Sequence, residues 1–76
     1  MASTLQGQWG ANLRRLRKQR KLSQTALAQL VGMEPSHITR AEQGLANIGD
    51  ERRIRLADAL GVRVEDIWTY PTKVAS

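Results

Sequence analysis

The chain has 76 residues, no cysteine and a formal net charge of +5, which suits one small domain and excludes disulfides, thiolate chemistry and a deep catalytic cavity. The single histidine, His37, has no carboxylates at metal-ligand spacing around it, so we expect no metal and no other cofactor. No apolar run approaches the roughly 20 residues that cross a bilayer. The opening segment lacks the order of a signal peptide, and the absence of cysteine suits a reducing compartment, so we expect a cytoplasmic protein.

A helix rich in basic residues is predicted near the start of the chain. Residues 1–7 are polar and aperiodic, so we expect a flexible tail there. From about Gln8 to Gln19, apolar residues recur at helical spacing: Trp9, Leu13 and Leu16. Six of the 12 basic residues lie within residues 14–21, and no acidic residue precedes Glu34. Such a cluster indicates a polyanionic partner, nucleic acid ahead of a membrane surface, or simply the solvent face of a helix.

The segment SQTALAQLVGM predicts a short helix that ends in a tight turn. Ser23 suits the N-cap because its hydroxyl can accept a hydrogen bond from a free backbone N–H. The helix should run through residue 30, with an apolar face of Leu27, Ala28, Leu30 and Val31. Gly32 suits the turn because glycine adopts positive φ without steric cost.

A third helix is predicted from about Pro35 to Gln43. Proline suits its first position, whereas Glu34 is a poor cap. With Ile38 and Ala41 facing inward, helical geometry puts four polar residues on the outer side and His37 on its flank. The four are Ser36, Thr39, Arg40 and Gln43. This pair of short helices, with an outward polar patch on the second, is typical of a helix-turn-helix. In such a motif the second helix reads base edges in the major groove of DNA.

Two further helices complete an all-α chain. After a loop over residues 45–49, Asp50 and Glu51 suit a helix start, and apolar residues then recur on one face: Ile54, Ala57 and Leu60. A last short helix is predicted from about Arg63, with apolar positions at Val64, Ile67 and Trp68. We therefore expect one domain over residues 8–70, with its helix-turn-helix at about 23–43, and a C-terminal tail over 71–76.

Residues 9–68 resemble the phage repressor and Cro type of helix-turn-helix domain, also called the xenobiotic-response-element family. The stretch LSQTALAQLVGM resembles the second helix and turn of that family, and ITRAEQG resembles the end of its recognition helix. LADALGV, followed by VEDIW, resembles its last two helices. The resemblance implies a compact five-helix bundle of the lambda-repressor-like type and a transcription regulator that binds double-stranded DNA.

The resemblance also implies roles for three residues. Arg17 and Glu42 would form an interior ion pair, and helical geometry places each at the edge of a buried side; the alternative is two unrelated surface charges. Gln24 would bind a DNA phosphate and brace the recognition helix; the alternative is an ordinary exposed glutamine.

Three departures from the family pattern are visible. Glu34-Pro35 stands where a serine or threonine cap is usual, and a carboxylate beside phosphates is unfavourable unless it accepts from a cytosine amino group. Ile48-Gly49 replaces a common Pro-Ser opening of the fourth helix. Asp50 and Arg53 stand where leucine is frequent, which predicts a thinner core around that helix.

On DNA we expect base contacts and phosphate contacts. Arg40 can donate two hydrogen bonds to guanine, while Ser36 and Thr39 can pair with base edges or pack on a thymine methyl. His37 either reaches a base or a phosphate or is merely a partly exposed helical residue. The phosphate backbone would be held, with salt-dependent affinity, by Gln24, Gln43, Asn47 and some of Arg14, Arg15 and Lys18.

One recognition helix reads too few base pairs for specificity in a genome, so we expect a homodimer on a two-fold operator. The candidates for the dimer contact are Ile67, Trp68 and Tyr70. Alternatively, Trp68 completes the core of the monomer itself.

The favoured function is a small repressor or controller protein. The first alternative is the antitoxin of a toxin–antitoxin pair, which would add a toxin partner. A bridging protein that keeps the fold but binds other proteins is disfavoured by the outward polar patch on the third helix. An enzyme is least supported, because the sole histidine has no nucleophile–base set and no glycine loop cradles a phosphate.

Overall fold

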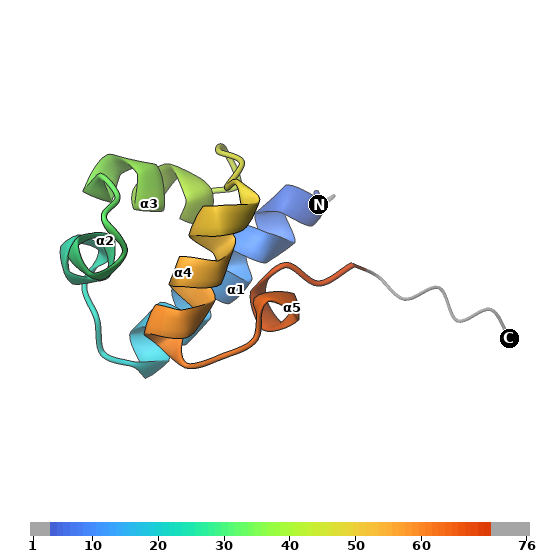
Figure 1. Ribbon diagram of the computed structural model, residues 1–76. Coiled ribbons are helices and arrows are strands. Elements are labelled where there is room, and N and C mark those ends of the chain that lie inside the picture. Colours follow the sequence, from blue (N-terminus) through green and yellow to red (C-terminus); the bar gives the residue numbers. More distant parts are fainter. Residues whose placement is uncertain (1–3, 71–76) are drawn as a thin grey trace, which may run out of the picture.

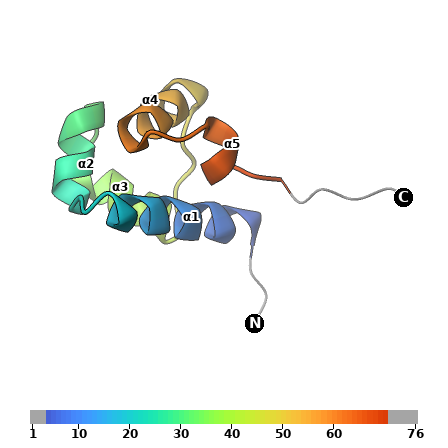
Figure 2. The same ribbon diagram turned by 90° about the horizontal axis from the view of Figure 1, so that it is seen from below.

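The computed structural model describes residues 4–70. They form α1 (Leu5–Gln19), α2 (Gln24–Val31), α3 (Pro35–Glu42), α4 (Asp50–Leu60) and α5 (Val64–Ile67) and contain no strand. α1 packs against α3 and α5, α2 packs against α3 and α4, and α4 packs against α5. In Figure 1, α2 and α3 form one side of the molecule and α5 lies on the other; Figure 2 shows α1 running along one edge. None of these helices is long and apolar enough to cross a membrane.

The first helix begins earlier than the sequence predicts. Its start at Leu5 rather than Gln8 follows from Thr4, whose Oγ1 accepts a hydrogen bond from the backbone N–H of Gly7 at 2.8 Å. Residues 4–7 therefore belong to the folded domain, and the expectation of a tail is wrong for them. Residues 1–3, together with the tail predicted over 71–76, lie outside the described residues.

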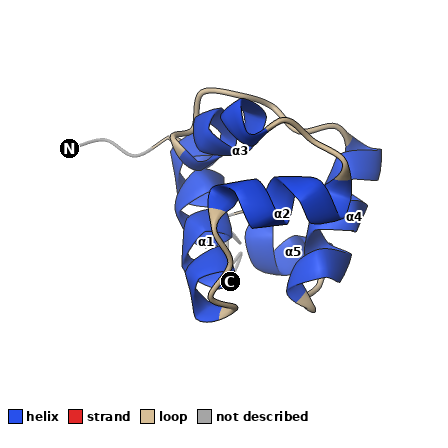
Figure 3. Cartoon of the chain, turned by 90° about the vertical axis from the view of Figure 1, so that its left-hand side faces the viewer, coloured by secondary structure: helices blue, strands red, loops and turns tan. Residues whose placement is uncertain are grey.

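The turn between α2 and α3 has the predicted local chemistry. Ser23 caps α2, with its Oγ accepting from Ala26 N at 2.9 Å, and Gly32 ends α2 in the left-handed conformation at φ 69°. Glu34 makes no side-chain capping hydrogen bond to α3, and Gln43 is the C-cap of α3 rather than its last helical residue. In Figure 3, α3 lies across the upper end of the molecule, with α2 running below it.

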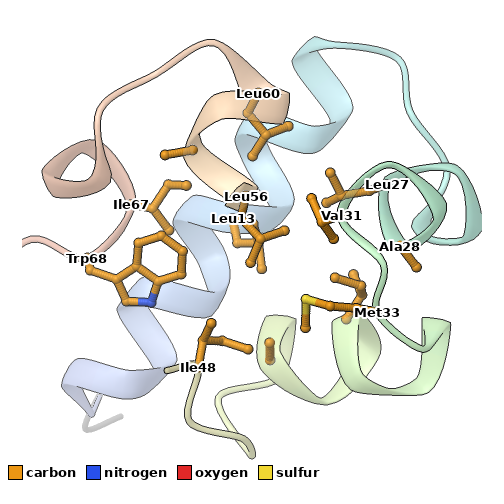
Figure 4. Packing of buried hydrophobic residues seen from close by; sticks show 13 residues of the cluster. Leu13, Leu27, Ala28, Val31, Met33, Ile48, Leu56, Leu60, Ile67 and Trp68 are labelled. Atoms are coloured by element: carbon orange, nitrogen blue, oxygen red, sulfur yellow. The ribbon is translucent and has the colours of Figure 1, made fainter. Parts of the chain in front are cut away.

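The core draws side chains from all five helices. Its largest fully buried members are Leu13, Leu27, Ile38, Leu56, Leu60 and Ile67. Figure 4 shows Leu13 and Leu56 at the centre of the cluster, with Trp68 on one side and Leu27 on the other. Every helix is therefore fixed by at least one side chain that is inaccessible to water.

Two residues that the sequence assigns to apolar faces lie at the surface. Leu30 is 62% exposed and Ile54 is 55% exposed. The inward faces are instead centred on Leu27, Ala28 and Val31 in α2 and on Leu56, Ala57 and Leu60 in α4. Each exposed residue lies roughly 100° from the centre of its buried face, which is too far to reach the core.

Arg53 fills the space at which the sequence predicts a thinner core. Its guanidinium carbon lies 5.0 Å from the ring centroid of Trp9 and 5.2 Å from that of Trp68, so the cation stacks on both indoles. Its Nε donates to the carbonyl of Ile48 at 2.9 Å, and Ile48 is itself buried. The expectation of weak packing around α4 is therefore corrected, because a stacked arginine takes the place of a leucine.

The segment that follows α5 is part of the core. Ile67 is fully buried and Trp68 is only 5% exposed. Asn12 Nδ2 donates to the carbonyl of Ile67 at 3.0 Å, and Trp9 Nε1 donates to that of Thr69 at 2.7 Å. Ile67 and Trp68 thus offer no surface to a second chain, which corrects their assignment to a dimer contact. Trp68 instead completes the core of the monomer.

Candidate nucleic-acid interface

α3 presents a polar outer face. Ile38 and Ala41 are buried on its inner side at 0% and 5% exposure. The outer side carries the residues that helical geometry predicts: Ser36, Arg40 and Gln43 are exposed and Thr39 is half-buried. Because three of these four side chains are exposed, this face is open to a partner.

A buried ion pair fixes the C-terminal end of α3 to α1. Arg17 Nε lies 2.5 Å from Glu42 Oε2, and Arg17 Nη2 lies 3.1 Å from Glu42 Oε1. The side chains are only 9% and 4% exposed. Arg17 Nη1 also donates to the carbonyl of Leu22 at 2.8 Å, which ties the chain just before α2 to the same guanidinium. The geometry is bidentate, the form in which an arginine–carboxylate pair fixes orientation as well as distance.

Gln24 connects this pair to the outer side of α3. Its Nε2 donates to Glu42 Oε1 at 3.0 Å, and its Oε1 accepts from Thr39 Oγ1 at 2.8 Å. α1, α2 and α3 are therefore joined by one continuous chain of polar contacts. In the described part of the chain, every buried side-chain nitrogen or oxygen has a hydrogen-bond partner. Gln24 thus contacts two residues of α3, the helix that the resemblance expects it to brace, and its contact with a DNA phosphate stays a prediction.

A cavity of about 270 Å³ opens beside this network. Its lining comes from α1, α2 and the end of α3: Arg14, Arg17, Gln24, Thr39, Glu42 and Gln43. The structure thus brings together four residues that the sequence predicts as DNA contacts, namely Arg14, Gln24, Thr39 and Gln43. Guanidinium and amide groups supply the hydrogen-bond donors that phosphate oxygens accept.

The other predicted contacts do not line this cavity. Ser36 and Arg40 lie on the exposed face of α3 and His37 is half-buried on the same helix, while Lys18 and Asn47 are exposed on α1 and in the loop before α4. Arg15, by contrast, donates to Asn12 Oδ1 at 3.2 Å, so its guanidinium lies beside the amide that binds α5. Within residues 4–70, no three histidine, aspartate or glutamate side chains lie together as a metal site would require.

The contact between Gln24 and Thr39 was not predicted. These residues lie 15 positions apart on different helices, and no spacing rule joins them. The carbonyl of Leu22 as a partner of Arg17 was also missed, because a backbone acceptor leaves no trace in residue identity. The only sequence signal for these contacts was the position of Gln24 at the first turn of α2.

A family model described as a helix-turn-helix domain matches residues 8–67. Comparison with curated proteins gave no significant match. Among solved structures, the chain resembles the restriction-modification controller protein C.AhdI from Aeromonas hydrophila, at 33% sequence identity, with 80% of this chain and 92% of that chain covered and a TM-score of 0.77. It also resembles the clp gene regulator ClgR from C. glutamicum, at 25% identity, with 90% and 87% covered and a TM-score of 0.83.

The same fold forms part of a larger protein. HppE, solved in complex with its substrate, is 26% identical, with 84% of this chain but only 36% of the HppE chain covered and a TM-score of 0.78. The match therefore concerns a domain of HppE and not its whole length. The five-helix fold, the family match over residues 8–67 and the likeness to two regulators together show that the chain belongs to the helix-turn-helix domain family, among the DNA-binding regulators of the Cro/C1 type.

Proposed function

We propose that this chain is a sequence-specific regulator of transcription, a small repressor or controller protein that reads double-stranded DNA in the major groove with α3. The observation that carries the proposal is the exposed polar face of α3, held in place from behind by Arg17 and Glu42. The likeness to C.AhdI, a restriction-modification controller protein of which the chain covers 92%, supports a controller role.

The residues divide between reading and anchoring. Arg40, which is exposed on α3, would donate two hydrogen bonds to a guanine, and Ser36 would contact a neighbouring base. The cavity lined by Arg14, Gln24 and Gln43 would receive a backbone phosphate, because these three side chains carry hydrogen-bond donors. The phosphate contact would set how deeply α3 enters the groove, and the side chains of α3 would set which sequence is preferred.

We further propose that two copies bind a two-fold operator. Two recognition helices placed about 34 Å apart would read successive major grooves on one side of B-DNA. Of the three residues considered for the contact, Tyr70 alone keeps surface: it is 63% exposed and packs edge-to-face on Trp9 with ring centroids 5.3 Å apart. Tyr70 is therefore our candidate for the dimer contact.

The test is selection of preferred duplexes from a random library, followed by footprinting of the winning sequence. We expect two similar half-sites whose centres lie about one helical turn apart. Sedimentation of the protein with and without the selected duplex then gives the number of copies bound. Binding that stays equal on selected and random DNA would refute sequence-specific reading, and a single copy on the full operator would refute the dimer.

Arg40→Ala gives a matched test of base reading, with Arg52→Ala as the control. Both arginines are exposed, but Arg52 lies on α4. Arg40→Ala should cost about 1–3 kcal/mol of binding free energy on the selected site and relax the preference at one base pair. The control should leave that preference unchanged. If Arg40→Ala weakened all sequences equally, Arg40 would be a phosphate contact instead.

A further inference from the structure

We infer that Thr39 reads DNA through its methyl group, as a contact to the 5-methyl of a thymine, and that its hydroxyl donates no hydrogen bond to a base. This inference rests on the proposed function and assigns one base preference within it. It follows from the polar network behind α3, in which each contact determines the orientation of the next.

The network starts with the carboxylate of Glu42. Both of its oxygens accept hydrogen bonds from Arg17, and a carboxylate paired in this way has no proton to donate. The amide of Gln24 lies 3.0 Å from Glu42 Oε1. Only its NH₂ group can face that oxygen, because a carbonyl oxygen there would repel the carboxylate. The amide of Gln24 is thereby fixed with Oε1 on the opposite side.

Gln24 Oε1 in turn fixes the hydroxyl of Thr39. The two oxygens lie 2.8 Å apart, and since an amide oxygen is an acceptor only, the hydroxyl must donate its single proton. The second oxygen within reach, the carbonyl of Pro35 at 3.1 Å, is also only an acceptor. Whichever of the two receives it, the proton of Thr39 is used inside the protein.

For contact with DNA, Thr39 keeps its methyl group and the acceptor lone pairs of its hydroxyl oxygen, but no hydrogen-bond donor. Thr39 is half-buried between exposed Ser36 and Arg40 on the outer side of α3. Of the four bases, thymine presents a methyl in the major groove, and packing a threonine methyl on it excludes water from both. Thr39 therefore favours thymine at one of the base pairs that α3 would cover.

The test uses the selected operator with its thymines replaced one at a time by deoxyuridine, which lacks the methyl. Wild-type protein should bind about four-fold more weakly at one thymine position in a half-site, the effect of one lost methyl-sized contact. Thr39→Ser keeps the hydroxyl and removes the methyl. It should bind the thymine duplex about four-fold more weakly than wild type does and show no further loss with deoxyuridine.

Thr39→Val is the complementary variant, because it keeps a methyl and removes the hydroxyl. It should stay sensitive to deoxyuridine at the same position while binding all duplexes more weakly, since the brace to Gln24 is lost. The inference is overturned if Thr39→Ser retains the wild-type response to deoxyuridine, or if folded Thr39→Val loses the preference for thymine. If Thr39→Val fails to fold, the responses of wild type and Thr39→Ser to deoxyuridine are sufficient to decide the inference. A selection that yields no preferred sequence would overturn the proposed function, and the thymine contact with it.

Discussion

Replacing Arg17 with methionine separates the structural arginine from the arginines of the same helix that we propose as DNA contacts. Methionine keeps much of the length of the side chain and removes the charge. Glu42 then loses two of the three side-chain hydrogen bonds that it accepts and keeps only the one from Gln24. Its side chain is 4% exposed, so water replaces the lost donors only in part.

The expected cost is about 3–5 kcal/mol, the usual effect of removing one partner from a buried ion pair. A domain of this size has a total stability of only about 5–15 kcal/mol, and 1 kcal/mol shifts its Tm by about 4–8 °C. Arg17→Met should therefore melt more than about 10 °C below wild type. The loss of the contact to the carbonyl of Leu22 adds to this effect.

The matched control is Arg14→Met, the same substitution three residues earlier at an exposed position. It should change stability by no more than about 0.5 kcal/mol but weaken DNA binding and lower its salt dependence. Urea denaturation followed by circular dichroism gives both free energies of unfolding. Adding Glu42→Leu to Arg17→Met should recover part of the loss, because no charge is then left buried. Equal stability of the two single variants would refute the role assigned to the pair.

Three further predictions concern other parts of the fold. Gln24→Ala should weaken binding to selected and random duplexes by the same factor, as a phosphate contact does; unchanged affinity on both would remove that role. Trp68→Ala should cost about 3–5 kcal/mol of stability, measured by thermal denaturation, because the indole is 5% exposed. A variant that is as stable as wild type but sediments differently would instead assign Trp68 to a dimer interface. Gly10→Ala should lower the Tm, because a Cβ at this position would lie 2.5 Å from two carbonyl oxygens at the end of α3. Gly49→Ala should lower it much less, because its Cβ would meet no atom within 4 Å beyond the adjacent residues and only the N-cap of α4 is weakened. Equal melting temperatures of the two glycine variants would show that α1 can move away from α3.

Local signals predicted the helix-turn-helix well. Ser23, Gly32 and Pro35 each act through the backbone of neighbouring residues, so their effects are readable without the rest of the fold. Thr4 carries the same kind of signal as Ser23, but the missing apolar periodicity before residue 8 hid it. The outer face of α3 was predictable too, because a helical repeat over eight residues leaves little freedom once Ile38 is placed inside.

The register of α4 and the position of Trp68 were not predictable in the same way. The inward face of α4 runs through Leu56, Ala57 and Leu60, and its next position toward the N-terminus is Arg53. Because a charged residue interrupts the apolar stripe of α4, the stripe is hard to recognise in the sequence. Ile54, the next residue, suggested a different inward face for the helix. Arg53 is accepted there only because Trp9 and Trp68 lie on it. Three residues from distant parts of the chain must be seen together before any of them can be placed.

The proposed reading of DNA by α3 would therefore be a property of the tertiary structure. A helix of eight residues is too short to be stable alone, since isolated helices of fewer than ~12 residues are marginal in water. α3 is instead held at Thr39 by Gln24 and at Glu42 by Arg17, while Gly10 lets α1 approach its last carbonyls. The same contacts that make α3 rigid decide which groups it can offer to a base. A substitution on α1 that disturbs these contacts should consequently alter base recognition without touching DNA.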